Sequence, residues 1–243
     1  MKMTLMQHFI ELRRRILWVV LVFGVAFGAG WFIAPYMQEF MVSPLMSVWS
    51  DGTMLYTGLA DGLLIQFSLA TLFAMLFTIP VVLWHIWAFV APGLHKNEKQ
   101  LILPILILSP ILFLVGAGFA FYILFPLAFE FFIKMNESAN ISTVLLPAMK
   151  DYLSFAIGLL KVFGLAFQLP LVLVLLNRLG ILPRSVAVKF RRYAIVGIFV
   201  IAAILTPPDI VSQCLLALPM WGLFEASILF MKPGSPVVKK SEQ

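Results

Sequence analysis

Residues 16–33 read ILWVVLVFGVAFGAGWFI, an uncharged apolar run that directly follows three arginines, Arg13, Arg14 and Arg15. A helix needs about 20 such residues to cross a bilayer. Arginines before an apolar run also occur in signal peptides, but Glu11 interrupts the charge here and the run is long enough to span. We therefore interpret it as an uncleaved first membrane helix.

The composition extends this interpretation to the rest of the chain. Hydrophobic residues make up 62% of the 243 residues and charged residues only 12%. Soluble domains carry roughly 25% charged residues, so this chain lacks the polar groups to cover a water-facing surface. The sequence predicts an all-α membrane protein, a single integral domain over residues 1–243, with six spanning helices near residues 16–35, 66–90, 101–125, 152–176, 193–205 and 210–231.

Three features of these spans bear on how the helices pack. The fifth span has 13 residues, which at 1.5 Å each reach ~20 Å of a ~30 Å hydrocarbon core. We interpret the short final pair as a site of bilayer thinning; the alternative is a hairpin that stops short of the far surface. Gly24 and Gly28 form a GxxxG pair, either a close helix contact or a chance placement. Prolines inside the spans predict a kinked, concave bundle, and these are Pro80, Pro104, Pro110, Pro170 and Pro219.

The distribution of Lys and Arg predicts the orientation. Four precede the first span, two lie between the second and third, five between the fourth and fifth, and three follow the last. Because basic residues are retained on the cytoplasmic side, both termini are predicted to be cytoplasmic in a bacterial inner membrane. We interpret the net charge of +6 as this topology signal, facing anionic lipid, and not as a nucleic-acid surface.

Motifs for enzyme chemistry are absent from the sequence. It has no P-loop or dinucleotide fingerprint, and its three histidines lack the spacing of metal ligands. No serine or cysteine has a base at motif spacing, and the sole cysteine, Cys214, lies in an apolar run. The sequence therefore predicts no cofactor, no metal and no catalytic activity.

Two polar stretches lie beside the spans. Residues 8–15 read HFIELRRR, where helical spacing places Glu11 one turn from Arg14 and Arg15; alone, this indicates a solvated ion pair. Residues 87–99 read WAFVAPGLHKNEK, where a Pro-Gly turn ends the second helix and Glu98 lies among cations. Alone, this second stretch is typical of an ordinary polar loop.

Taken together, and with five further runs, these stretches resemble the TatC family, the large core subunit of the twin-arginine protein translocase. The further runs are FPLAF at 125–129, YLSF at 152–155, LTPPD at 205–209, SQ at 212–213 and LALP at 216–219. The resemblance covers nearly the whole chain in the right order. It implies a receptor for twin-arginine signal peptides on folded cargo, homo-oligomeric in the complex. It also implies single-span TatA- and TatB-type partners and export driven by the proton-motive force.

The resemblance implies a signal-peptide site at the cytoplasmic surface. Glu98 and Glu11 would supply its carboxylates, since guanidinium and carboxylate groups form bidentate, charge-assisted hydrogen bonds. Phe89 and Leu94 would shape the adjacent apolar contact. Arg13 also matches a family position, and we expect it to hold Glu11 in place.

Four residues near the opposite surface match family positions as well. Pro44 and Asp209 lie where family members depend on these residues, although Asp209 has the alternative role of capping the last helix. Thr206 and Gln213 belong to a polar patch that docks a partner helix in the family.

Two further polar residues, Gln168 and Lys161, lie inside the predicted fourth span. Many family members carry a glutamate where this chain has Gln168, which argues against an essential proton relay there; the amide would instead line the concave face. Lys161 lies seven residues earlier on the same helix face, and either it is functional or its side chain extends to the interface. Glu225, near the cytoplasmic boundary, would pair with a basic neighbour that the sequence does not identify.

The alternative function is a secondary transporter of a small solute or ion. Such a protein needs polar groups that converge near the membrane midplane, often on broken helices. Only Lys161 and Gln168 meet that requirement here.

Overall fold

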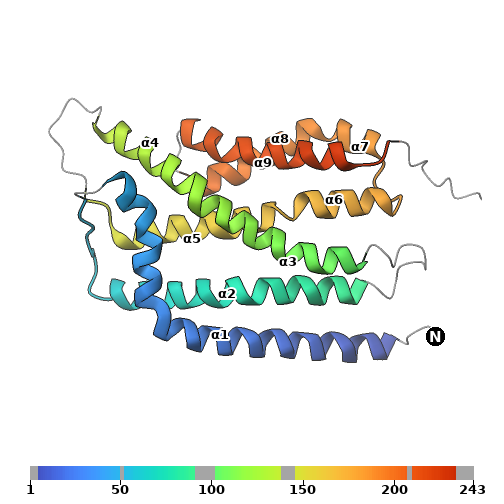
Figure 1. Ribbon diagram of the computed structural model, residues 1–243, viewed down its shortest axis with the longest axis horizontal. Coiled ribbons are helices and arrows are strands. Elements are labelled where there is room, and N and C mark those ends of the chain that lie inside the picture. Colours follow the sequence, from blue (N-terminus) through green and yellow to red (C-terminus); the bar gives the residue numbers. More distant parts are fainter. Residues whose placement is uncertain (1–4, 50–51, 91–101, 138–145, 207–209, 234–243) are drawn as a thin grey trace, which may run out of the picture. The chain divides into compact units, whose positions relative to one another are not determined.

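The computed structural model describes residues 5–49, 52–90, 102–137, 146–206 and 210–233. Apart from an isolated bridge between Leu55 and Ala148, every regular element in these residues is helical (Figure 1). The elements are α1 (Leu5–Val48), α2 (Asp61–Val90), α3 (Ile102–Phe119), a π-helical turn (Ala120–Leu124), α4 (Phe125–Glu137), α5 (Met149–Ala166), α6 (Leu169–Arg178), α7 (Arg184–Lys189), α8 (Arg191–Leu205) and α9 (Ile210–Phe230). The predicted all-α class is confirmed.

Five segments of the described chain are long and apolar enough to cross a membrane. They are Arg13–Val48, Asp61–Ile86, Pro104–Met135, Met149–Arg178 and Ile210–Phe230. The predicted short fifth span is found as α8, whose 15 residues reach about 22 Å at 1.5 Å each. This helix is shorter than the hydrocarbon core, as its sequence indicated, and local thinning of the bilayer stays a prediction.

The first helix continues beyond the predicted end at Pro35 and runs on to Val48. Proline lacks the N–H that would bond the carbonyl four residues earlier, which normally weakens a helix at that point. Here that carbonyl, on Trp31, accepts a hydrogen bond from the Gln66 side-chain amide on α2, at 3.3 Å. Because a neighbouring helix satisfies the freed group, α1 does not have to end.

A second proline, Pro44, lies further along the same helix and is buried. The carbonyl that it leaves without its usual donor belongs to Phe40. The hydroxyl of Ser43 donates to this carbonyl at 2.7 Å. Ser43 therefore satisfies the carbonyl that Pro44 frees, as Gln66 does for the carbonyl that Pro35 frees. The helix again continues past its proline.

The fourth predicted span is interrupted. α5 ends at Ala166 and α6 begins at Leu169, with Gln168 at the N-cap position of the new helix and Pro170 in its first turn. Proline fits the first turn of a helix because the N–H groups there have no partner within the helix. The same residue cannot continue α5, so one predicted span becomes two helices.

The chain divides into two compact units, and the single domain stays a prediction. Unit 1 comprises Met1–Leu114 and Val144–Ile157; unit 2 comprises Val115–Thr143 and Gly158–Gln243. In unit 1, α1 packs along α2 (Figure 1).

The close approach of α1 and α2 occurs at Gly30. A Cβ there would lie 2.9 Å from the Phe73 Cβ and 3.0 Å from the Ala70 carbonyl oxygen. A Cβ on Gly24 or Gly28 would meet nothing within 4 Å. Within the described chain, α1 therefore does not meet α2 at the GxxxG pair, and both interpretations of that pair stay predictions.

In unit 2, α9 packs against α6 and α8. The buried amide of Asn177, at the end of α6, donates to the Leu182 carbonyl at 3.0 Å and accepts from the Lys232 N–H at 2.8 Å. One side chain thus fixes both the turn after α6 and the chain after α9. Gly180 lies in that turn with φ of 71°, a conformation that glycine adopts without strain.

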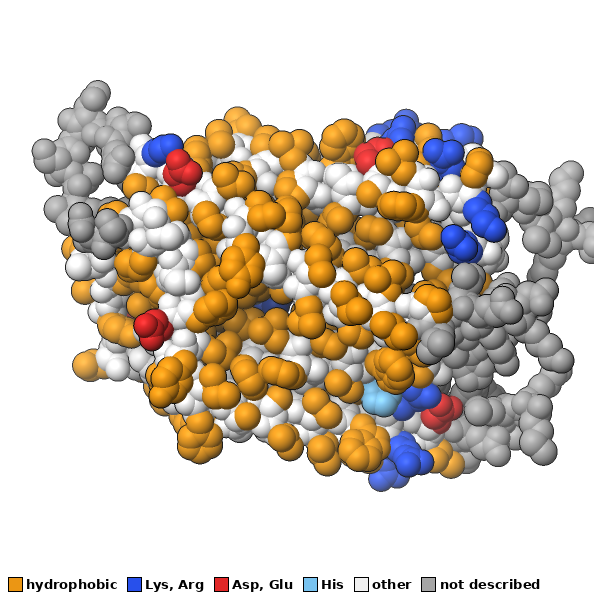
Figure 2. Space-filling view, in the orientation of Figure 1, with side chains coloured by type: hydrophobic (Ala, Val, Ile, Leu, Met, Phe, Trp, Pro, Cys, Tyr) orange, Lys and Arg blue, Asp and Glu red, His pale blue; other side chains and the backbone are white. Residues whose placement is uncertain are grey.

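Most charged side chains visible in Figure 2 lie near helix ends, and hydrophobic side chains cover most of the middle of the helices. The space-filling view shows exposed apolar groups along the long helices, as a lipid environment requires. The most exposed large examples include Phe32, Tyr36, Tyr122, Ile204 and Ile210. This pattern supports the membrane assignment independently of helix length.

Candidate ligand-binding site

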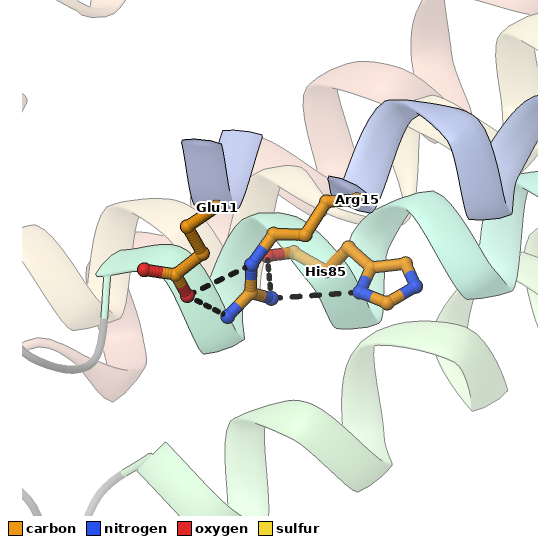
Figure 3. Close-up of polar contacts among 3 residues, drawn as sticks. All are labelled: Glu11, Arg15 and His85. Atoms are coloured by element: carbon orange, nitrogen blue, oxygen red, sulfur yellow. Dashed lines mark hydrogen bonds and ion pairs between the residues drawn. The ribbon is translucent and has the colours of Figure 1, made fainter. Parts of the chain in front are cut away.

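The N-terminal part of α1 presents an acid next to three cations. Glu11 and Arg15 lie one helical turn apart, so their side chains meet on one face of α1. The Arg15 Nε and Nη2 atoms donate to the Glu11 Oε1 atom at 3.1 and 2.5 Å (Figure 3). This ion pair is only 20% and 26% exposed on its two side chains, so water screens it less than a surface pair.

The same guanidinium also reaches α2. Its Nη1 atom donates to the His85 carbonyl oxygen at 3.0 Å and lies 3.4 Å from the His85 Nδ1 atom (Figure 3). A guanidinium only donates, so Nδ1 accepts and the ring proton belongs on Nε2. All three nitrogens of Arg15 are thus engaged, and Arg15 connects Glu11 to the neighbouring helix.

This arrangement holds the Glu11 carboxylate while leaving part of it accessible. Both bonds from Arg15 end on Oε1, and Figure 3 shows the other carboxylate oxygen directed away from Arg15. A carboxylate oxygen fixed in this way can accept charge-assisted bonds from a further cationic donor. The site is therefore suited to a positively charged ligand.

The residue that holds Glu11 is Arg15, and the expectation for Arg13 is wrong in the described structure. Residues two apart on a helix point to different sides, whereas residues four apart face each other. Arg13 accordingly has an exposed side chain. Helical spacing alone indicated Arg14 and Arg15 as neighbours of Glu11; the family position suggested Arg13.

The remaining predicted site residues at this surface are only partly described. Phe89 is the second-last residue of α2, and its backbone is helical. Leu94 and Glu98 lie outside the described residues, as does Asp209 near the opposite surface. Their roles stay predictions.

Pro44 lies near the C-terminal end of α1, where its carbonyl accepts a hydrogen bond from the Ser47 hydroxyl at 2.8 Å. The buried Tyr152 hydroxyl on α5 donates to the Met41 carbonyl at 2.5 Å. Nearby in sequence, Leu55 exchanges backbone bonds of 3.0 Å with Pro147 and Met149. These contacts tie the end of α1 and the following loop to the start of α5, and the role of Pro44 beside them stays a prediction.

Thr206 and Gln213 both form hydrogen bonds inside unit 2. The hydroxyl of Thr206, the residue that follows α8, donates to the Ala202 carbonyl in the last turn of that helix at 2.9 Å. The Gln213 amide donates from α9 to the Phe199 carbonyl on α8 at 3.0 Å. Gln213 therefore joins the two final helices, and its role in docking a partner helix stays a prediction.

Two intramembrane polar residues lie on the broken fourth span. Lys161 is partly buried on α5, and Gln168 is buried between the end of α5 and the start of α6.

The basic partner of Glu225, which the sequence did not identify, is Arg191, at 2.6 Å. That pair joins α8 to α9, and no spacing rule within one helix could have found it.

The described residues contain no cluster of His, Cys, Asp or Glu suited to a metal ion.

The fold and the site together define a class of protein. It is a multi-pass helical membrane protein with a carboxylate that an arginine holds in place at a basic helix end. A family model described as "Sec-independent protein translocase protein (TatC)" matches residues 7–219. The chain belongs to this TatC family.

Individual relatives agree with the family match. The TatC protein of Escherichia coli strain K12 is 37% identical over 230 residues, 94% of this chain and 88% of that protein. TatCy of Bacillus subtilis strain 168 is 36% identical over 244 residues, 99% of this chain and 93% of that protein. A crystal structure of a twin arginine translocase receptor TatC superposes with a TM-score of 0.82 at 32% identity, covering 92% of this chain and 97% of that one. Members of this family are described as components of a protein translocase. The family match therefore does not favour the alternative of a solute transporter.

Proposed function

We propose that this chain is the core receptor subunit of a twin-arginine translocase in the bacterial inner membrane. It binds the twin-arginine signal peptides of folded proteins at the cytoplasmic face. The observation that carries the proposal is the Glu11 carboxylate, which Arg15 holds through one oxygen while the other is directed away. The family supplies the context in which a fixed carboxylate has a cationic peptide as its ligand.

The chemistry of the ligand matches this site. A guanidinium and a carboxylate form bidentate bonds that a lysine cannot reproduce, so paired arginines call for fixed acids. Glu11 would bind one arginine and Glu98 the other, with Phe89 and Leu94 forming the apolar contact beside them. Arg15 lowers the entropy cost of binding because it already holds Glu11 in one geometry.

The cytoplasmic placement follows from the basic residues. Arg13, Arg14 and Arg15 mark one end of α1, and Arg191 and Arg192 mark the start of α8. Lys and Arg are retained inside, so these ends and both termini would be cytoplasmic.

The chain would work without catalysis of its own, in a complex with further copies and with TatA- and TatB-type single-span proteins. These partners would move the cargo at the expense of the proton-motive force. Near the surface opposite the cytoplasmic face, Thr206 and Gln213 would contact a partner helix, and Pro44 and Asp209 would shape the same surface.

Binding of a twin-arginine signal peptide to the purified full-length chain tests the proposal. Glu11→Gln keeps the side chain's size but removes the charge, so we expect the Kd to rise about tenfold to a hundredfold, the range for hydrogen bonds to charged groups. Glu39→Gln, an exposed acid near the other end of α1, is the matched control and should change nothing. Equal binding of twin-arginine and twin-lysine peptides to the wild-type chain would refute the proposal.

A further inference from the structure

Lys161 lies near the middle of a membrane span. The segment Met149–Arg178 has 30 residues and is long and apolar enough to cross the bilayer. At 1.5 Å per residue, Lys161 is within about 4 Å of the midpoint of this segment. A cation at such depth is costly and is normally matched by a counter-charge or by a polar cavity.

The described residues do not supply that counter-charge. Their ion pairs are Glu11–Arg15, Glu130–Lys134, Asp61–Lys150 and Glu225–Arg191, and Lys161 takes part in none of them. The acids of the five apolar segments lie within ten residues of a segment end, and these are Glu39, Asp61, Glu130, Asp151 and Glu225. On the same helix, Asp151 is ten residues away, about 15 Å along the axis.

The side chain is also open to the surroundings of the helix. Lys161 is only partly buried, and Leu165, one turn further along the same face, is 53% exposed. A partly buried ammonium next to an exposed leucine can be reached by a group outside the chain. In a bilayer that group is either on another spanning helix or on a lipid headgroup to which the lysine extends.

We propose that Lys161 docks a membrane-spanning helix of another subunit that carries a carboxylate near its own middle. The proposal rests on the proposed function, since it specifies the chemistry of one partner in the translocase complex. Charge complementarity selects this occupant: a carboxylate at the same depth neutralises Lys161 where water is absent. An uncharged helix would leave the ammonium unpaired, and a headgroup would require it to leave the middle of the span.

The test uses the full-length chain in phosphatidylcholine vesicles with a synthetic spanning helix of leucine and alanine as probe. One version of the probe carries a single central glutamate and the matched version a glutamine, and association is followed by energy transfer. We expect the glutamate probe to bind about tenfold more tightly, the scale of polar contacts between membrane helices. Lys161→Met should abolish this preference. Lys150→Met, at the start of α5 where Lys150 is near Asp61, should retain it.

Three outcomes would overturn the inference: equal binding of the two probes, a preference that survives Lys161→Met, or a spin label at position 161 that reports headgroup depth. Twin-arginine peptide binding is measured on the same vesicles. If the wild-type chain fails to bind that peptide, the proposed function fails whatever the probes show. If the peptide binds and the glutamate probe has no advantage, only the docking inference fails.

Discussion

An arginine–glutamate pair lies near a basic helix end in each unit, but the two pairs are built differently. In unit 1, Glu11 and Arg15 are on the same helix, and Arg15 reaches α2 through the His85 carbonyl. In unit 2, Arg191 is on α8 and Glu225 on α9, so the ion pair itself spans the two helices.

This difference separates a ligand-binding acid from a structural one. In unit 1 the arginine joins the helices, and the acid only has to be held, so its second oxygen remains available. In unit 2 the acid itself forms the ion pair between the two helices. We therefore expect removal of Glu11 to affect binding, and removal of Glu225 to affect the packing of α8 on α9.

The largest effect is expected from Arg15→Ala. This change frees Glu11 and also removes the charge-assisted bond from Arg15 to the His85 carbonyl on α2, and such a bond contributes about 1.5–3 kcal/mol. Signal-peptide binding should fall by about a hundredfold, and the thermal midpoint of the detergent-solubilised chain should drop. Peptide titration and a thermal melt measure the two effects separately.

Arg14→Ala is the matched control for this change, because Arg14 is the neighbouring arginine and its side chain is exposed. It should leave both measurements near wild type. If Arg14→Ala and Arg15→Ala had equal effects, positive charge in general would matter, and the specific geometry of Arg15 would not.

A smaller effect is expected from Glu225→Gln in unit 2. The pair is 45% exposed at Arg191 and 24% at Glu225, so its contribution is that of a screened surface ion pair, about 0.5 kcal/mol. The thermal midpoint should shift slightly at low salt and not at all near 1 M salt, where the Debye length falls to about 3 Å. Peptide binding should not change; a loss comparable to that of Glu11→Gln would place the ligand at both pairs.

The sequence predicted the membrane class because the length of an apolar run is directly related to the thickness of a bilayer. It did not predict that α1 passes Pro35, because the compensating amide of Gln66 is on another helix. Close approach at Gly30 instead of Gly24 and Gly28 likewise depends on which face of α1 meets α2.

For the candidate site, the sequence predicted the contact within α1 but not the contact between α1 and α2. The spacing of Glu11 and Arg15 within one helix indicated that they meet. The His85 contact was missed since its main acceptor is a backbone carbonyl, which every residue carries and no side-chain pattern reveals. The partner of Glu225 was missed because α8 and α9 are separate helices.

The smallest effect is expected from His85→Ala, which tests whether the unit 1 pair depends on backbone or side chain. The Arg15 bond to the His85 carbonyl is 3.0 Å and survives the change, whereas the contact with the ring Nδ1 atom is longer, at 3.4 Å. We expect a change in peptide Kd of less than about threefold and a stability change within about 0.5 kcal/mol. A tenfold loss in the same titration would show that the imidazole holds Arg15. In that case the Glu11–Arg15 pair would depend on a side chain from a neighbouring helix, as the Glu225–Arg191 pair does. The two units would then differ only in whether the acid is on the same helix as its arginine.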